Sequence, residues 1–202
     1  MKERFLKKAT KIIKDKKKDM DEEKLEEILY GLEGLYLTFT KMAVIFIIAL
    51  ILNIVKDVIL LMIFYNIIRT TAFGMHAKKS IHCLIISLLF FIGGALLCKY
   101  VIIPSYIKII LASIALILLF KYAPADTYKR PLINAKRRRI YKILSVLSGS
   151  IYLVLIILFR NLSITNYICV GLWEAILMIH PLTYRMFQLP YSNYKNYVAT
   201  YN

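Results

Sequence analysis

The chain has 202 residues, of which 59% are hydrophobic, and its 28 Lys and Arg against 12 Asp and Glu give a formal net charge of +16. An ordinary soluble domain is roughly 45–50% apolar, so the composition excludes a typical soluble fold and indicates a membrane protein. The 3 cysteines are widely spaced and form no C-x-x-C pair, which favours neither a disulfide framework nor a zinc site.

The N-terminal part of the chain combines many charged residues with two apolar patterns at helical spacing. One pattern, over residues 5–13, predicts an amphipathic helix on an anionic membrane surface. The second covers residues 25–35, with Asp21 as its N-cap. We therefore predict a cytoplasmic amphipathic helical arm over residues 1–41, with a solvated charged arm of modest helicity as an equally weighted alternative.

From residue 42 onward, apolar runs alternate with short polar interruptions. This pattern predicts an all-α polytopic membrane protein with about six hydrophobic helical segments, some of them short or re-entrant. The run 58–68 would cover only about 16 Å at 1.5 Å per residue, so a tilted or re-entrant arrangement is expected there. The apolar runs are 42–55, 58–68, 81–97, 101–120, 143–159 and 164–182.

The basic residues predict how these segments are oriented. If all the runs cross the membrane and the N-terminus is cytoplasmic, the outer loops hold Lys56, Lys99 and Arg160, and every basic cluster stays inside. A single long helix over 42–68 would reverse this parity, whereas a 42–68 hairpin in a four-span version would keep it. We therefore predict a protein of the cell membrane with both termini in the cytoplasm.

This topology divides the remaining chain into a membrane-embedded domain over 42–187 and a cytoplasmic C-terminal tail over 188–202, with cytoplasmic loops at 69–80 and 121–142. In the second loop, eight basic residues are opposed only by Asp126. Such a loop could contact anionic lipid, nucleic acid or an acidic polypeptide. No zinc-finger or RNA-binding signature accompanies it, so we expect anionic membrane lipid rather than nucleic acid as a partner.

The segment FGMHAKKSIHC, residues 73–83, holds His76 and Cys83 at the predicted cytoplasmic boundary. A catalytic thiol needs a base or a field that lowers its pKa. In one unbroken helix, two residues seven positions apart would be separated by about 10.5 Å along the axis and could not touch. The backbone must therefore change direction between them, and Gly74 and Ser80 offer the means.

With Ser80 as the N-cap of a new helix, Cys83 lies in its first turn, where the helix dipole stabilises a thiolate. Lys78 and Lys79 act in the same sense, and His76 could fold back toward the sulfur. The alternative is an interfacial histidine beside a small apolar cysteine within a span.

Two stretches of the sequence carry a family resemblance. RTTAFGMHAKKSIHC, residues 69–83, resembles the R-x(4)-G-x-H-A-x(5)-C pattern of the accessory gene regulator protein B family, the membrane cysteine endopeptidases of peptide quorum sensing. KYAPADTYKRPL, residues 121–132, is similar to the segment that follows the middle spans of that family. The length, the charged arm and the order of apolar runs agree across almost the whole chain.

The resemblance implies that Cys83 is the nucleophile and His76 the general base and acid, with Arg69 and Gly74 as supporting residues beside Ser80. It implies an AgrD-like precursor peptide with an amphipathic leader, a central cysteine and an acidic C-terminal tail. Cleavage removes the tail, and the central cysteine captures the acyl group as a thiolactone, or a serine does so as a lactone. A homodimer is also implied. No metal or other cofactor is expected.

The basic loop gains a candidate role from this resemblance. An acidic tail would be attracted to its basic residues, which could draw the scissile bond toward the site. Orientation in the membrane and contact with anionic lipid explain the same residues equally well. The residues concerned are Lys129, Arg130, Lys136, Arg137, Arg138 and Arg139.

Other chemistry-bearing residues receive structural interpretations. Glu174, in the last apolar run, must pair or face a cavity because an ionised group in lipid is costly. Asp126, which follows Pro124 closely, is interpreted as a turn and ion-pair residue rather than a third catalytic group. Cys98 and Cys169, in or beside apolar runs, are interpreted as structural.

Two other function classes compete with the endopeptidase. A transporter is disfavoured because the chain lacks clear repeat halves and paired Gly/Pro-broken helices. A non-catalytic membrane scaffold that binds or exports a small peptide is favoured if His76 and Cys83 prove dispensable.

Overall fold

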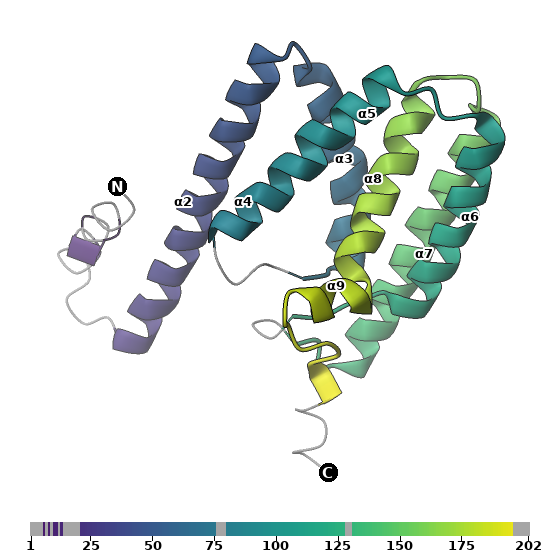
Figure 1. The fold of residues 1–202 in the computed structure, drawn as a ribbon. Helices are drawn as coiled ribbons and strands as arrows, with labels where there is room; N and C mark the ends of the chain where they lie inside the picture. Colours follow the sequence, from purple (N-terminus) through teal and green to yellow (C-terminus); the bar gives the residue numbers. More distant parts are fainter. Residues whose placement is uncertain are drawn as a thin grey trace. The chain divides into compact units, whose positions relative to one another are not determined.

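The computed structural model describes residues 21–75, 80–127 and 131–195, together with residues 6, 8, 10, 11 and 13. Within this part of the chain, helices are the only extended regular structure (Figure 1). An isolated bridge joins Phe73 to Ala125. The chain forms two compact units, residues 1–48 and 49–202, which are taken separately below.

In the first unit, most of the described residues belong to helix α2, Glu22–Ile51. The Leu25 N–H donates to the Asp21 carbonyl oxygen at 3.0 Å, so α2 begins directly after the predicted N-cap residue. The helix continues without a break through residue 41, the predicted end of the arm, because residues 31–51 form one uninterrupted helical and apolar stretch. The arm and the first apolar run are therefore one helix.

Helix α2 is separated from helix α3, Val55–Ala72, by a short turn. Asn53 in this turn has a φ of 52°, a left-handed conformation that Asn tolerates better than most residues. A single helix over residues 42–68 is therefore excluded. The predicted short segment 58–68 is wrong in length, because Lys56, Asp57 and Arg69 are helical too, and the 18 residues of α3 span about 27 Å.

The remaining helices follow the predicted apolar runs. Helix α4, a π-helical segment and helix α5 together form one continuous helical segment over residues 80–100. Helices α6 and α7 come next, and α8 leads through His180 into the short helix α9. Their bounds are α4 Ser80–Leu88, η1 Leu89–Gly93, α5 Gly94–Tyr100, α6 Ser105–Tyr122, α7 Ala135–Leu158, α8 Ile164–Ile179 and α9 Pro181–Met186.

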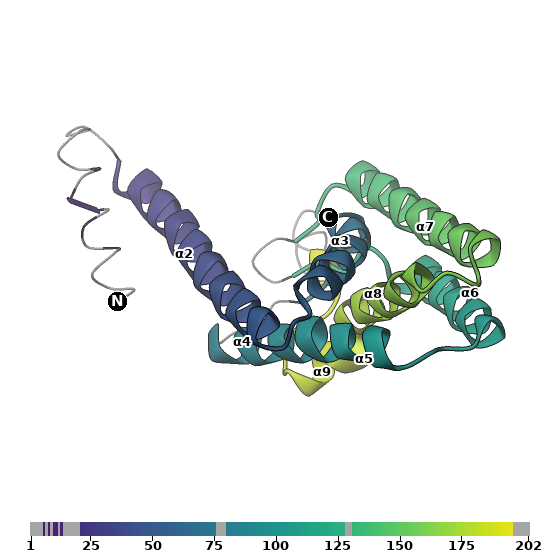
Figure 2. The same cartoon turned by 90° about the horizontal axis from the view of Figure 1, so that it is seen from above.

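Helix α8 lies at the centre of the second unit and packs against α3, α5, α6 and α7 (Figures 1 and 2). Most of its 16 residues are buried. Gly171 allows the close approach of α3, because a Cβ added there would lie 3.0 Å from the Tyr65 backbone nitrogen. The helix that the sequence marks as one more apolar segment is thus the core of the fold.

The other long helices expose large apolar side chains in a way that suits lipid rather than water. Among the residues that the structure describes, four helical stretches are long and apolar enough to cross a membrane, and α8 adds a shorter apolar helix. Together these features confirm an all-α polytopic membrane protein. The four stretches are Gly31–Ile51, Ile81–Tyr100, Ser105–Tyr122 and Ala135–Leu158.

Both predicted loops are shorter than expected. Arg69–Ala72, placed in the loop 69–80, forms the last turn of α3, and Ser80 is already the first residue of α4. In the loop 121–142, residues from Ala135 onward form the start of α7. The Asn134 side chain caps this helix by accepting from the Arg137 N–H at 3.1 Å, and Lys and Arg are good helix formers.

Candidate active site

The chain reverses its course between α3 and α4, within the segment that contains the predicted catalytic pair. Helix α3 ends at Ala72, and the next two residues have positive φ values, 57° at Phe73 and 114° at Gly74. Helix α4 then begins at Ser80. The predicted break near Gly74 and the new helix near Ser80 are therefore confirmed.

The backbone of residues 73–75 is hydrogen-bonded to two other parts of the fold. The Gly74 N–H donates to the Ala125 carbonyl oxygen at 2.8 Å, and the Ala125 N–H donates to the Ala72 carbonyl oxygen at 2.9 Å. The Met75 N–H donates to the Met178 carbonyl oxygen near the end of α8, also at 2.9 Å. The backbone directly before His76 is therefore held by the segment after α6 and by α8.

Arg69 stabilises the same turn from the last turn of α3. Its guanidinium donates to the carbonyl oxygens of Phe73, Gly74 and Met75, with distances of 3.1 Å to Gly74 and 2.6 Å to Met75. Arginine suits this position because its planar fork presents several donors at once. The predicted supporting residues Arg69 and Gly74 thus lie in one hydrogen-bonded turn.

Gly74 is required here for conformation and for space. A φ of 114° is rarely adopted by residues with a side chain. A Cβ at this position would also lie 2.6 Å from the Met178 carbonyl oxygen, which is already used by Met75. Glycine is therefore the residue that both the turn and the contact with α8 demand.

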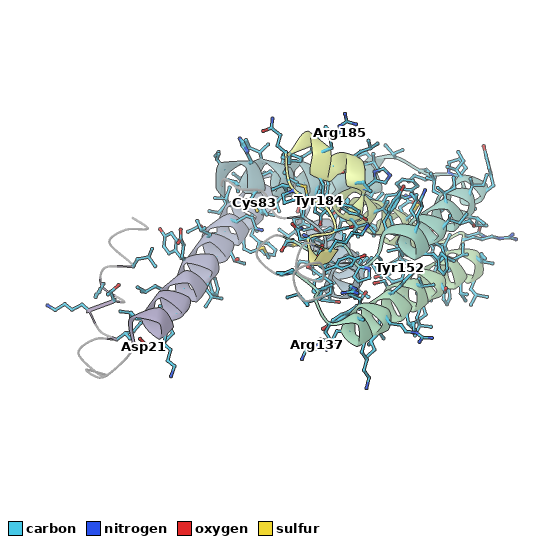
Figure 3. All side chains as sticks on the ribbon, turned by 90° about the horizontal axis from the view of Figure 1, so that it is seen from below. Asp21, Cys83, Arg137, Tyr152, Tyr184 and Arg185 are labelled. Atoms are coloured by element: carbon cyan, nitrogen blue, oxygen red, sulfur yellow. The ribbon has the colours of Figure 1, made fainter. Side chains whose placement is uncertain are left out.

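Cys83 lies in the first turn of α4 and is half-buried, and Figure 3 labels it on that helix. Cys98 and Cys169 are buried, with 4% and 1% of their surfaces exposed. The predicted base His76 lies outside the described residues, as do Lys78 and Lys79. Of the predicted site, the structure therefore describes the position of Cys83 and of the backbone from Arg69 to Met75.

Tyr65 was not singled out by sequence reasoning. It precedes Arg69 by one helical turn on α3. Its ring packs edge-on against Phe91 of the π-helical segment at 5.3 Å between centroids. The i, i+4 spacing from Arg69 is the signal that could have found it, because residues so spaced share a helix face.

Asp126 also has a larger role than the sequence suggested. Its carboxylate is 3% exposed and accepts hydrogen bonds from the backbone N–H groups of Leu132, Asn193 and Tyr194. Its own carbonyl oxygen accepts from the Tyr184 hydroxyl at 2.9 Å. Burial raises the pKa of Tyr184, so this hydroxyl keeps its proton and donates.

The basic residues at the start of α7 divide into two groups. Lys136, Arg137 and Arg139 are exposed, and Figure 3 labels Arg137 at this end of the helix. Arg138 is half-buried and donates to the carbonyl oxygens of Leu132 and Ile133, each at 2.7 Å. Three of these side chains can therefore meet a ligand, while Arg138 is engaged in the fold. Lys129 and Arg130 lie outside the described residues.

Glu174 lies within α8 and is 6% exposed. Its Oε2 has no hydrogen-bond partner among the described residues, and Oε1 occupies the space that a Cβ at Gly94 would need. The carboxyl group therefore packs against the glycine of α5 that follows the π-helical segment. Within the described residues, no three His, Cys, Asp or Glu side chains gather in a group that could hold a metal ion.

Comparison with known proteins gives one consistent family. The sequence model of the accessory gene regulator B family matches residues 6–179. An AgrB-like protein of Clostridium acetobutylicum is 32% identical over 176 residues, covering 87% of this chain and 84% of that protein. An AgrB-like protein of Listeria monocytogenes serovar 1/2a is 34% identical over 188 residues, covering 92% and 91%.

The accessory gene regulator protein B of Staphylococcus aureus is 31% identical over 169 residues, covering 84% of this chain and 89% of that protein. No solved structure matches the chain. All three matches span most of both proteins, so the similarity is not confined to one motif.

Proposed function

The chain belongs to the accessory gene regulator B family, and from this premise we propose that it is a membrane cysteine endopeptidase that processes an autoinducing-peptide precursor. Family membership supports a role in accessory gene regulator quorum sensing. In the proposal, Cys83 is the nucleophile and His76 is the general base and acid. The substrate is a precursor peptide with a central cysteine and an acidic C-terminal tail.

The observation that carries the proposal is the reversal of the chain between α3 and α4. In a continuous helix, His76 and Cys83 would be held about 10.5 Å apart. Because α3 ends at Ala72 and α4, which holds Cys83, begins at Ser80, no single helix runs from α3 through Cys83. The reversal also leaves Cys83 in the first turn of α4.

In the first proposed step, His76 takes the proton of the Cys83 thiol, and the thiolate attacks the carbonyl carbon that precedes the acidic tail. A carbon–sulfur bond forms and the peptide carbon–nitrogen bond breaks. The departing amine takes the proton from His76. The tail leaves with a free amino group, and the rest of the precursor is held on Cys83 as a thioester.

In the second step, the precursor's own cysteine thiol attacks that thioester. Its sulfur bonds to the acyl carbon and its proton passes to the departing Cys83 sulfur, so that a cyclic thiolactone is released. One thioester replaces another with little change in bond energy, and the intramolecular attack has a high effective concentration. Exclusion of water protects the thioester from hydrolysis, which a site at the membrane boundary favours.

We place this site on the cytoplasmic side of the cell membrane. The support is the positive-inside rule, because Lys78 and Lys79 between α3 and α4, the basic start of α7 and the basic N-terminal arm all fall on one side when every apolar run crosses the membrane. There, the exposed Lys136, Arg137 and Arg139 would attract the acidic tail of the precursor and would also contact anionic lipid.

The test uses the full chain in lipid vesicles with an acidic-tailed precursor. Release of the tail and of the cyclic product is followed by mass spectrometry for the wild type, Cys83→Ala and His76→Ala. Cys98→Ala is the matched control, because it removes a thiol of the same chain that is buried in α5. We expect both site variants to lose tail release and the control to keep it. Tail release that persists in Cys83→Ala would refute the proposal.

A further inference from the structure

Asp126 joins two segments that are distant in the sequence. One carboxylate oxygen accepts from the Asn193 N–H at 2.9 Å, and the other accepts from the N–H groups of Tyr194 at 2.7 Å and Leu132 at 3.3 Å. Hydrogen bonds to an ionised acceptor are among the stronger ones, and a buried carboxylate is costly without them. Asp126 therefore anchors the segment 190–195, which was predicted as part of a tail.

The segment 190–195 has further contacts that make it part of the fold. The Tyr191 ring packs edge-on against Tyr184 at 5.1 Å between centroids, and burial raises the pKa of Tyr191 to about 12. The Arg138 guanidinium lies over the Tyr194 ring at 4.0 Å from its centroid. Asn193 is 1% exposed. The segment is thus packed against α9 and the start of α7.

The neighbour of Asp126 holds the turn that leads to His76. Ala125 forms the parallel bridge with Phe73 and exchanges hydrogen bonds with Ala72 and Gly74. The Tyr184 hydroxyl reaches the carbonyl oxygens of Ala125 and Asp126, at 3.4 Å and 2.9 Å. A displacement of the Asp126 backbone would therefore be passed to residues 73–75.

We propose that Asp126 is a positioning residue for the acyl transfer and that the segment 190–195 is an integral part of the active region. The buried carboxylate ties this segment and Leu132 to the backbone of residues 125–126. That backbone in turn holds Gly74 two residues before the base. The inference rests on the proposed function, because its effect is on the approach of His76 to Cys83.

The variants are Asp126→Ala and truncation after Tyr191, which removes the two backbone donors at positions 193 and 194 but keeps the contact between Tyr191 and Tyr184. The matched control is truncation after Lys195, which keeps both donors. A third variant, Tyr184→Phe, removes only the hydroxyl that binds the same backbone. Tyr184→Phe replaces the other variants in the test if they fail to fold.

The first measurement is tail release in vesicles. We expect kcat to fall about tenfold or more in Asp126→Ala and after truncation at Tyr191, since small misplacements of reacting groups are costly, while KM changes little. The double variant should be no worse than the more impaired of the two single variants, because both break the connection between Asp126 and the segment 190–195. Truncation after Lys195 should leave kcat unchanged. Additive losses would overturn the inference.

The second measurement is the pH profile of Cys83 alkylation, which reports the pairing of the thiolate with its base without requiring substrate. Asp126→Ala should shift the profile to higher pH, as His76→Ala does. If His76→Ala shifts the profile and Asp126→Ala only lowers the melting temperature, the positioning role is refuted and the proposed function stands. If His76→Ala neither shifts the pH profile of alkylation nor lowers tail release, the proposed function itself is refuted, independently of the role of Asp126.

Discussion

Arg69 donates a hydrogen bond to the carbonyl oxygen of Met75 at 2.6 Å, and Met75 is the residue directly before the proposed base His76. The same guanidinium reaches the carbonyl oxygens of Phe73 and Gly74. The last turn of α3 thus controls where the chain leaves that helix. A side chain that sequence reasoning named only as supporting is the main hydrogen-bond donor of the turn.

Replacement of Arg69 by Lys is expected to preserve the positive charge but to lose the hydrogen bonds that hold the turn at residues 73–75. A single ammonium group cannot reproduce a planar fork that spans three carbonyl oxygens. We expect tail release by Arg69→Lys to fall about tenfold or more, because residues 73–75 lose their fixed position. Lys121→Arg, a conservative exchange at the exposed end of α6, is the matched control. Wild-type activity in Arg69→Lys would contradict this role.

Replacement of Gly74 by Ala should destabilise the fold and reduce activity together. The added Cβ would require a strained φ and would meet the Met178 carbonyl oxygen. We expect a loss of about 1–3 kcal/mol in the free energy of unfolding, measured by thermal unfolding in detergent.

Gly31→Ala is the matched control for this prediction. A Cβ at Gly31 of α2 meets nothing within 4 Å, and alanine is the better helix former. Its stability should therefore equal or exceed that of the wild type. Equal losses in the two variants would show that the conformation at Gly74 carries no special requirement.

Replacement of the exposed Lys136, Arg137 and Arg139 by Gln should raise the KM for an acidic-tailed precursor. The expected change is about tenfold at low salt and smaller as salt is added, because exposed charges are screened. The measurement is the rate of tail release against precursor concentration at two salt concentrations. A precursor with an uncharged tail is the control and should show no such change.

Arg138→Gln should differ from this triple variant. The Arg138 side chain is already engaged by two carbonyl oxygens and the Tyr194 ring. Its loss should lower stability rather than raise KM. If all four positions act alike on KM, the division of the basic cluster is wrong.

Lys108 gives a stability prediction far from the proposed chemistry. This lysine of α6 is 4% exposed, and its ammonium donates to the Thr165 hydroxyl at 2.6 Å and to the Arg160 carbonyl oxygen at 3.2 Å. Lys108→Met should lower the free energy of unfolding by about 1–3 kcal/mol, because the buried Thr165 hydroxyl loses a charged donor. The exposed side chain of Arg160 is not part of this contact, so Arg160→Ala should be close to neutral. Equal losses would contradict the assignment.

Several features of the fold could be predicted from local patterns. The apolar runs become helices, Asp21 precedes α2, and the chain breaks at Gly74 before a helix that begins at Ser80. The length of α3 could not be read in the same way, because its charged ends interrupt the apolar pattern. Asp57 is stabilised there by the Tyr167 hydroxyl and lies 4.0 Å from the Lys99 ammonium, both from other helices.

The candidate site shows the same division. Its residue types and spacing, from Arg69 to Cys83, are visible in one continuous stretch, and the family resemblance of that stretch implied a reaction. The contact of Met75 with α8 and the bridge between Phe73 and Ala125 were not visible. They depend on how three separate parts of the chain pack, and no local pattern records that.

The sequence by itself determined the helical membrane character and the break in the chain, because hydrophobic length and glycine conformation are properties of neighbouring residues. Only the tertiary structure decided what Asp126 does. Its carboxylate binds the Asn193 N–H, 67 positions along the chain. A buried carboxylate takes whichever donors the packed helices bring to it, and that choice is made only when the chain is folded.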